Sequence, residues 1–389
     1  MVTMTPRQRV QTALNHQEPD RVPLDLGTGG SSSPVPEAYQ KLAEHFGIEP
    51  QVQLVPHMLR LAVVDERILE QLAIDTRPVG MRPVRRGVRP SDEPGHFYDD
   101  WGVKWKEIDT GKTIYREIVA NPLAEATLDD LDRYPWWPDP MDPDRYEGVR
   151  EQAERLFRQT DYALVGCPGF NGVWERACYL CGFPRMLESL ALDREFAHAV
   201  LRRITDLSKA ALGRYLDLAG PYIQIIKMGD DLGTQNGPMM SPQTYREVVK
   251  PYHKELFDLI KERSQARIFL HTCGSVYRLL PDLIEAGVEV LNPVQVSARD
   301  MDTRRLKAEF GDRLSFMGAI DTQRVLPFGT VEDVRREVER RIADLAPGGG
   351  YIVAPVHNVQ ADVPPENLVA MYRHAQKVGR YPLQFSARP

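Results

Sequence analysis

Two side chains that bind metals stand two residues apart near the middle of the chain, His271 and Cys273. They follow the apolar run Ile268–Leu270, so we expect them at the end of a β-strand. Side chains two apart on a strand point to the same face, and an imidazole and a thiol would therefore project together. This pair is half of a zinc site, although a buried cysteine beside a hydrogen-bonded histidine gives the same pattern.

A third zinc ligand is expected from the end of another strand. His357 follows the apolar run Tyr351–Ala354, at the level at which His271 follows its own run. Three protein ligands are the usual minimum for zinc, so we predict His271, Cys273 and His357 as the metal-binding set. Aspartates at other strand ends compete for this role, or orient the ligands, or act as catalytic groups, and they also make ordinary helix caps and loop salt bridges. These aspartates are Asp230, Asp231 and Asp321.

Amide side chains also follow the apolar runs. Burying so many polar groups at one end of successive strands is costly unless they bind a ligand or one another. We therefore predict that they line a substrate pocket. The residues are Asn171, Gln235, Asn292, Gln295 and Asn358.

The elements that position these residues alternate between short β-rich runs and amphipathic helical segments from about residue 160 onward, which is typical of parallel βα units. The expected strands are residues 22–26, 162–165, 222–228, 267–270, 288–291, 314–317 and 351–354. The expected helices between them are residues 183–192, 196–218, 241–262, 276–286, 303–310 and 331–345. With one further strand this pattern gives the eight strands of a (β/α)₈ TIM barrel, a fold of class α/β whose chemistry lies at the C-terminal strand ends.

Two features extend this barrel. A first helix is expected after Thr5, which caps it, with Pro6 at its first position. Residues 75–135 have a different pattern, with a hairpin-like segment near residues 97–105, and we predict a β-hairpin insertion there. The whole chain, residues 1–389, is thus predicted as a single barrel domain with an N-terminal helical extension and this insertion.

Composition restricts the class of partner. The 389 residues have a net charge of -6, so no basic field attracts nucleic acid or an anionic membrane. No apolar run is long enough to span a bilayer, and the four cysteines are too few for a disulfide scaffold. We therefore expect a cytoplasmic protein that acts on a small molecule or binds another protein.

Several motifs resemble signatures of the uroporphyrinogen decarboxylase superfamily, and the resemblance extends from about residue 4 to residue 382. The superfamily implies a (β/α)₈ barrel that is commonly a homodimer. The motifs are Thr-Pro-Arg-Gln-Arg-Val at 5–10, Asp-Arg-Val-Pro at 20–23, Met-Gly-Asp-Asp-Leu-Gly-Thr-Gln at 228–235 with Met-Ser-Pro at 240–242, Gly-Ala-Ile-Asp at 318–321, and His-Asn-Val-Gln-Ala-Asp-Val-Pro-Pro-Glu-Asn at 357–367.

The superfamily contains two chemistries. Its decarboxylases use no metal or cofactor, and arginines of an Arg-Gln-Ala-Gly-Arg-Tyr loop pair with substrate carboxylates. The corresponding loop of this chain, residues 26–36, has no arginine. The other branch consists of corrinoid-linked zinc methyltransferases similar to methylcobalamin:coenzyme M enzymes, in which His-x-Cys and a later cysteine bind zinc. His271 and Cys273 match the first two of these ligands, and His357 stands in the region of the third.

The resemblance and the residues together predict a zinc-dependent methyltransferase. It would move a methyl group between a small donor, such as a methyl ether or a methylcorrinoid, and a corrinoid or thiol acceptor, with the corrinoid carried by a partner protein. One alternative is a cofactor-free tetrapyrrole decarboxylase, in which Asp25 or Asp230 would handle protons, with Arg60 or Arg278 in place of the lost arginines. The other is a non-catalytic protein that binds a corrinoid or tetrapyrrole.

Overall fold

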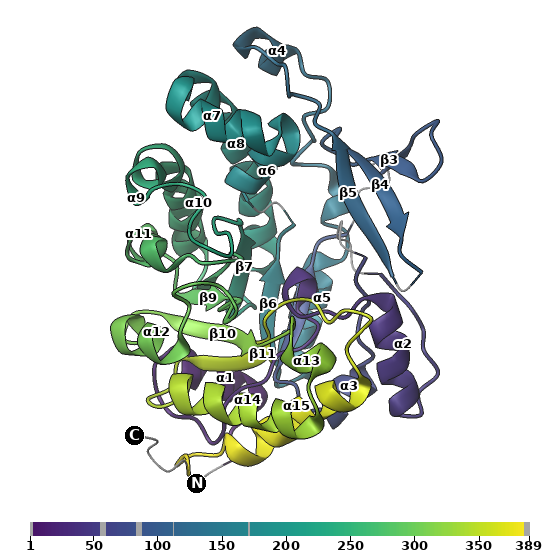
Figure 1. Ribbon diagram of the computed structural model, residues 1–389, viewed down its shortest axis with the longest axis vertical. Coiled ribbons are helices and arrows are strands. Elements are labelled where there is room, and N and C mark those ends of the chain that lie inside the picture. Colours follow the sequence, from purple (N-terminus) through teal and green to yellow (C-terminus); the bar gives the residue numbers. More distant parts are fainter. Residues whose placement is uncertain (1–2, 55–59, 83–87, 112, 170–171, 385–389) are drawn as a thin grey trace.

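A curled sheet of seven parallel strands forms the centre of the protein in the computed structural model, which describes residues 3–54, 60–82, 88–111, 113–169 and 172–384 (Figure 1). The predicted α/β barrel is confirmed, with seven regular strands where eight were expected. In their order across the sheet these are β1 (Thr76–Gly80), β6 (Ala163–Cys167), β7 (Ile225–Gly229), β8 (Arg267–His271), β9 (Val290–Asn292), β10 (Ser315–Ile320) and β11 (Tyr351–Pro355).

The expected strand at residues 22–26 lies in the gap between β11 and β1, but it forms an isolated β-bridge and not a regular strand. Leu24 forms a parallel bridge with Val353, whose N–H donates to Pro23 O at 2.9 Å. Pro23 has no N–H to donate, and the N–H of Leu24 bonds to the carboxylate of Asp75 at 2.8 Å instead of to a backbone carbonyl. The segment therefore closes the barrel without becoming a regular strand.

Asp75 joins this closing segment to the rest of the barrel. Its buried carboxylate accepts hydrogen bonds from Arg9 at 2.5 Å and from Arg21 at 2.8 and 3.0 Å, besides the bond from Leu24. Two guanidinium groups and one backbone N–H thus share the carboxylate, which compensates for its removal from water. The first helix, the closing segment and β1 all depend on this one side chain.

Helix α1 (Pro6–Leu14) covers the N-terminal end of the barrel. Thr5 and Gln8 form a capping box at its start, and Pro6 occupies its first turn, as predicted. Val10 and Leu14 pack into the interior cluster with barrel residues such as Phe269. The interior is therefore filled with apolar side chains at this end, and only the C-terminal strand ends remain for polar groups.

The other helices surround the sheet (Figure 1). The structure reproduces the predicted bounds of α7 (Phe183–Leu192), α12 (Thr303–Phe310) and α14 (Val331–Leu345). The predicted helix 241–262 is divided into α9 (Pro242–Thr244), a π-helical turn at Tyr245–Val249 and α10 (Lys250–Arg263). The remaining helices are α2 (Pro36–His45), α3 (Glu66–Gln71), α4 (Leu128–Arg133), α5 (Val149–Gln159), α6 (Trp174–Cys181), α8 (Arg194–Ala219), α11 (Leu280–Ala286), α13 (Val325–Phe328) and α15 (Pro365–Val378), with short 3-10 turns at Gly29–Ser31, Pro143–Arg145 and Tyr277–Leu279.

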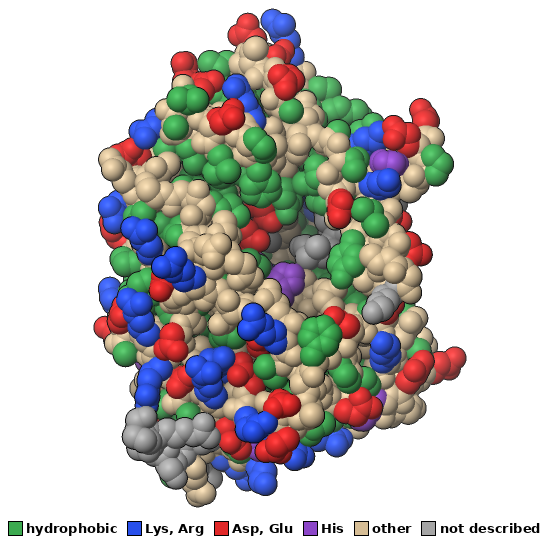
Figure 2. All heavy atoms as spheres, viewed as in Figure 1, with side chains coloured by type: hydrophobic (Ala, Val, Ile, Leu, Met, Phe, Trp, Pro, Cys, Tyr) green, Lys and Arg blue, Asp and Glu red, His purple; other side chains and the backbone are tan. Residues whose placement is uncertain are grey.

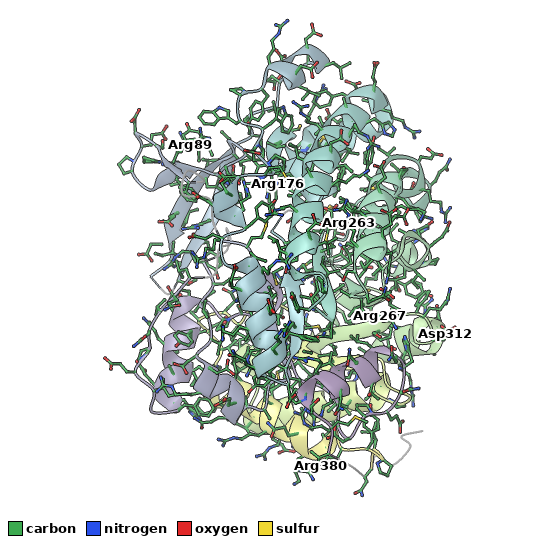
Figure 3. All side chains as sticks on the ribbon, turned by 180° about the vertical axis from the view of Figure 1, so that it is seen from behind. Arg89, Arg176, Arg263, Arg267, Asp312 and Arg380 are labelled. Carbon is green, nitrogen blue, oxygen red and sulfur yellow. The ribbon has the colours of Figure 1, made fainter. Side chains whose placement is uncertain are left out.

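A small antiparallel sheet lies beside α6 at the rim of the barrel (Figure 1). It falls within the range 75–135 that the sequence assigned to an insertion, although β1 at the start of that range belongs to the barrel. Its Trp105 packs edge-on against Tyr179 of α6, with ring centroids 5.7 Å apart. Arg176 of α6, which is labelled in Figure 3, pairs with Asp99 at 3.4 Å. The strands are β2 (Arg89–Pro90), β3 (His96–Tyr98), β4 (Lys104–Asp109) and β5 (Ile114–Ala120).

Within the described residues, no helix is both long and apolar enough to cross a bilayer. All four cysteines, which lie in the described part of the chain, are free thiols.

Replacing Asp75 by Asn is expected to lower the free energy of unfolding by about 3–5 kcal/mol, because the partly buried Arg21 would lose its counter-charge and the buried Arg9 would keep only Asp20. Urea denaturation followed by circular dichroism measures the change. The control is Asp258→Asn, which breaks an exposed pair with Lys254 and should cost less than about 1 kcal/mol. Equal effects of the two substitutions would contradict the role given to Asp75.

Candidate metal centre

The C-terminal ends of the barrel strands open into a hollow in which histidine and acidic side chains are exposed (Figure 2). This end is polar because the side chains change along each strand. On β8, Phe269 belongs to the apolar interior cluster, and His271 two residues later points the same way into the mouth. His357 follows β11 and reaches the same place from the other side of the barrel.

The structure brings His271, Cys273 and His357 together. One potential ligand atom from each lies within 4.8 Å of the other two, and the Cys273 Sγ lies 3.4 Å from His271 Nε2. Bonds of about 2.0–2.3 Å to a tetrahedral zinc ion would place ligand atoms roughly 3.3–3.8 Å apart. The distance between Cys273 and His271 matches this spacing, and the donor set of two imidazoles and one thiolate fits zinc.

Asn292 fixes the orientation of His271. Its amide Nδ2 donates to the Met317 carbonyl at 2.9 Å, so its Oδ1 faces the imidazole and accepts from His271 Nδ1 at 2.5 Å. The proton on Nδ1 leaves the lone pair on Nε2, the atom that faces Cys273. Ligating histidines are held by hydrogen bonds of this kind, and Asn292, predicted from sequence as a substrate-pocket residue, acts here through His271.

Both imidazoles are neutral at physiological pH. Burial, and then the charge of Lys227, lower the pKa of His271 to about 4. The pKa of His357 is also lowered to about 4, by burial first and then by His271. Burial raises the pKa of the Cys273 thiol, and the nearby carboxylate of Asp231 raises it further. The site therefore consists of two available nitrogen donors and one thiol that a metal ion would have to deprotonate.

Two of the predicted polar residues hold the turn after β8. Asp231 accepts from the Cys273 N–H at 2.8 Å, and Gln295 accepts from the Gly274 N–H at 2.7 Å. Gly274 has a φ of +85° and passes close to the backbone of Gly233, so a side chain there would collide with it. Asp231 and Gln295 thus position Cys273 from outside the group of three ligands.

Asp230 has a structural role at the start of α6. Its carboxylate accepts from the N–H groups of Val173, Trp174 and Glu175 at 2.6–2.9 Å, and from His253 Nε2 at 2.7 Å. Because these contacts occupy both oxygens, Asp230 anchors the N-terminus of the helix. This is the helix-capping alternative for the predicted aspartates.

The other predicted residues lie around the mouth or outside the described residues. Asp321 accepts from Gln323 and Arg324 N–H groups and so caps the turn after β10. Asn358 donates to Gly30 O at 2.8 Å, which ties the loop after His357 to the loop after the closing segment. Gln235 is exposed, and Asn171 lies outside the described residues.

Two of the residues that the decarboxylase alternative would use, Asp25 and Arg60, already pair with other protein groups. The Asp25 carboxylate is buried and accepts from three hydroxyls, those of Thr76, Ser32 and Thr28, at 2.5–2.9 Å. Arg60 pairs with Glu37 at 3.4 Å, and the side chain of Arg278 is exposed. Of the two arginines, Arg60 is therefore already paired with an acidic group.

Two charged groups at the mouth were not predicted from the sequence. Glu175 of α6 accepts a hydrogen bond from the Tyr179 hydroxyl, and burial together with the charge of Asp231 raises its pKa to about 7. Lys227 of β7 is only 7% exposed. The Glu175–Tyr179 spacing of four residues is a helical signal that was available, and Lys227 is the one charged residue in its apolar strand.

Comparison with known proteins identifies a family. Residues 113–378, more than half of the chain, match the family described as uroporphyrinogen decarboxylase (URO-D). A methylated-thiol:coenzyme M methyltransferase of Methanosarcina mazei is 28% identical over 238 residues, which cover 61% of this chain and 60% of that protein. A uroporphyrinogen decarboxylase of Legionella pneumophila is 26% identical over 234 residues, covering 58% of this chain and 62% of that protein. The chain thus spans about 60% of the length of these curated relatives.

A solved structure supports the fold. A methyltransferase from Methanosarcina mazei superimposes with a TM-score of 0.65 over 96% of this chain and 99% of that chain. The two sequences are 17% identical, so this likeness concerns the fold alone.

Zinc binding at pH 7 is expected to release about one proton, from Cys273, because the imidazoles are already neutral. The association constant should therefore rise about tenfold for each pH unit between pH 5 and 8, above the imidazole pKa values and below that of the thiol. Calorimetry in buffers of different ionisation enthalpy measures the released proton.

The Glu175→Gln variant is the control for this measurement, because it removes a neighbouring group whose pKa of about 7 lies within the measured pH range. If the logarithm of the zinc association constant of that variant rises by two for each pH unit, an imidazole is protonated in the free protein. If the association constant does not change with pH, no thiol is deprotonated when zinc binds. Either result contradicts the assignment of the three ligands.

Proposed function

Because the chain belongs to the uroporphyrinogen decarboxylase family, we propose that it is a metal-dependent methyltransferase. It moves a methyl group between a small donor, such as a methyl ether or a methylcorrinoid, and a corrinoid or thiol acceptor. The single observation that carries the proposal is the convergence of His271, Cys273 and His357 at the barrel mouth. The similarity to a methylated-thiol:coenzyme M methyltransferase supports this class of reaction.

Zinc is the metal that this donor set favours. Neutral imidazole and thiolate suit zinc better than magnesium or calcium, which prefer oxygen ligands. Zinc bound by three protein ligands would keep an open position and supply Lewis-acid chemistry, either holding a thiol as thiolate or polarising an ether oxygen. The proposal thus assigns His271, Cys273 and His357 to the metal, and Asn292 and Asp231 to their orientation.

The side chains around the three ligands are suited to handling one proton. Glu175 and Asp231 are close enough for each charge to act on the other, and the pKa of Glu175 near 7 means that it can be protonated or ionised at physiological pH. We assign to Glu175 the proton that leaves a thiol substrate or protonates a departing oxygen. Tyr179 orients the Glu175 carboxyl by its hydrogen bond.

The decarboxylase alternative has less support in the described residues. Decarboxylation of a polycarboxylated tetrapyrrole requires cations that pair with several acetate groups, whereas residues 26–36 contain no arginine and Arg60 is already paired with Glu37. The third alternative, a corrinoid-binding protein without activity, gives no reason for the two neutral imidazoles to face a thiol.

The partners remain predictions. A corrinoid carried by a second protein would reach the metal from the open mouth of the barrel, where the strand ends and the antiparallel sheet leave the hollow accessible (Figure 2). Assembly as a homodimer and a cytoplasmic location are expected from the family resemblance and the composition.

Wild-type protein purified without added zinc is expected to contain about one zinc ion per chain, and Cys273→Ser to weaken zinc binding at least about 100-fold. The same variant should lose methyl transfer from methylcobalamin to 2-mercaptoethanol. The metal-free forms of the two proteins should unfold at the same temperature, because Cys273 lies in a turn and contributes little to the core. Metal analysis and the absorbance of the corrinoid measure the two effects.

Cys167→Ser is the matched control, because Cys167 also points into the barrel but is not one of the three converging ligands. It should keep both zinc and activity. The proposal fails if Cys273→Ser retains stoichiometric zinc, or if wild-type protein with zinc bound transfers no methyl group.

A further inference from the structure

Lys227 points into the barrel interior. Ile225, two residues earlier on β7, packs in the interior cluster with Val165 and Phe269, and side chains two apart on a strand share a face. In the register of β7 and β8, Lys227 lies opposite Phe269 and Gly229 lies opposite His271. The Cα of Lys227 is therefore two residues nearer the N-terminal end of the barrel than the level of His271, and its long side chain extends within the barrel.

The groups that act electrostatically on Lys227 come from different parts of the barrel wall. They include Cys167 at the end of β6 and Asp25 of the closing segment. Its charge in turn lowers the pKa of both His271 and His357. The ammonium group is thus located in the space enclosed by the strands, on the inner side of the three converging ligands.

No side chain or carbonyl in the described part of the chain forms a hydrogen bond or an ion pair with this ammonium group, although the residue is only 7% exposed. The carboxyl group of Asp25 acts electrostatically on Lys227, but its two oxygens accept hydrogen bonds from three hydroxyls. The ammonium nitrogen itself is not among the buried atoms that lack a partner, so the tip of the side chain still reaches water although most of it is enclosed. Burial lowers the pKa of Lys227. A bound anion would favour the charged form and would pair with an ammonium group that no protein group contacts.

The acidic and basic side chains around the barrel mouth lie at different places. The acidic groups Asp231 and Glu175 lie near Cys273, whose thiol pKa both of them raise. Lys227 acts on both histidines, although Asp231 also acts on His357, and together with a metal ion the lysine would make the interior side of the pocket positive. An anionic group would therefore be attracted to the interior side and repelled from the side of the two carboxyl groups.

We propose that Lys227 binds the anionic group of the small-molecule substrate, and so selects small monoanions over neutral molecules of the same shape. The substrate would extend from the metal ligands inward, with its reacting heteroatom at the metal and its carboxylate or similar anion on the lysine ammonium. The placement of the heteroatom rests on the proposed function, whereas the anion site depends only on Lys227.

Two thiols that differ in one group test this inference. These probes are 3-mercaptopropionate, which carries a carboxylate, and 3-mercaptopropan-1-ol, which is neutral. Calorimetric titration of zinc-loaded wild-type protein should give at least about tenfold tighter binding of the carboxylate, equivalent to about 1.4 kcal/mol. Lys227→Met should bind both thiols equally, with an unchanged affinity for the alcohol and unchanged zinc content.

Lys307→Met is the matched control, because Lys307 is also desolvated but lies at the other end of the barrel, where it donates to the Gly349 carbonyl. It should keep the full preference, and Lys227→Arg should keep part of it. Methionine is apolar and close to lysine in length, so the Lys227→Met protein is expected to fold. Equal binding of the two thiols by wild-type protein, or a preference that survives in Lys227→Met, would overturn the inference.

The same titrations on metal-free protein separate this inference from the proposed function. If the carboxylate preference requires Lys227 but neither thiol responds to the metal, the anion site stands and the metal-dependent reaction fails. If both thiols bind only to the zinc-loaded protein and do so equally, the metal site stands and the role of Lys227 is wrong.

Discussion

The hydrogen bond between His271 Nδ1 and Asn292 Oδ1 is the interaction on which the candidate site depends. It exists because β8 and β9 are parallel neighbours in a register that places His271 opposite Asn292. The Asn292 amide is in turn oriented by the Met317 carbonyl of β10, so three consecutive strands determine one tautomer. Without this chain of bonds the Nε2 lone pair would not be directed to Cys273, and two metal-binding side chains would simply be neighbours.

The same barrel that assembles the site also produces its unusual charges. Burial removes the proton from both imidazoles and keeps it on the Cys273 thiol, while Glu175 and Asp231 share a region in which two full negative charges are unfavourable. Lys227 adds a basic group without a protein partner on the interior side, where burial lowers its pKa. A cation at the three ligands and an anion at the lysine would compensate these costs together, which is why we regard the mouth as a binding site and not as a polar end of the core.

Much of this arrangement was predictable from sequence because strand ends have a simple signature. An apolar run followed by polar residues identified His271, Cys273 and His357, and the capped helices α12 and α14 have their predicted bounds. Strand β1 was missed because Arg77 and Pro78 interrupt its apolar pattern. The roles of Asp230 and Asp321 could not be predicted, since a carboxylate that caps a turn and one that faces a ligand occupy the same kind of position. The inward orientation of Lys227 could not be predicted without the strand register, because its alignment with Phe269 shows which face of β7 it is on.

X-ray absorption at the zinc edge of the metal-loaded protein tests the central claim most directly, because it counts the atoms bound to the metal. The account predicts one sulfur at about 2.3 Å, two imidazole nitrogens at about 2.0–2.1 Å and one further light atom in the open position. A first shell of nitrogen and oxygen alone, or one without the outer-shell signal of two imidazole rings, would show that Cys273 and the two histidines do not share a metal and would contradict the account.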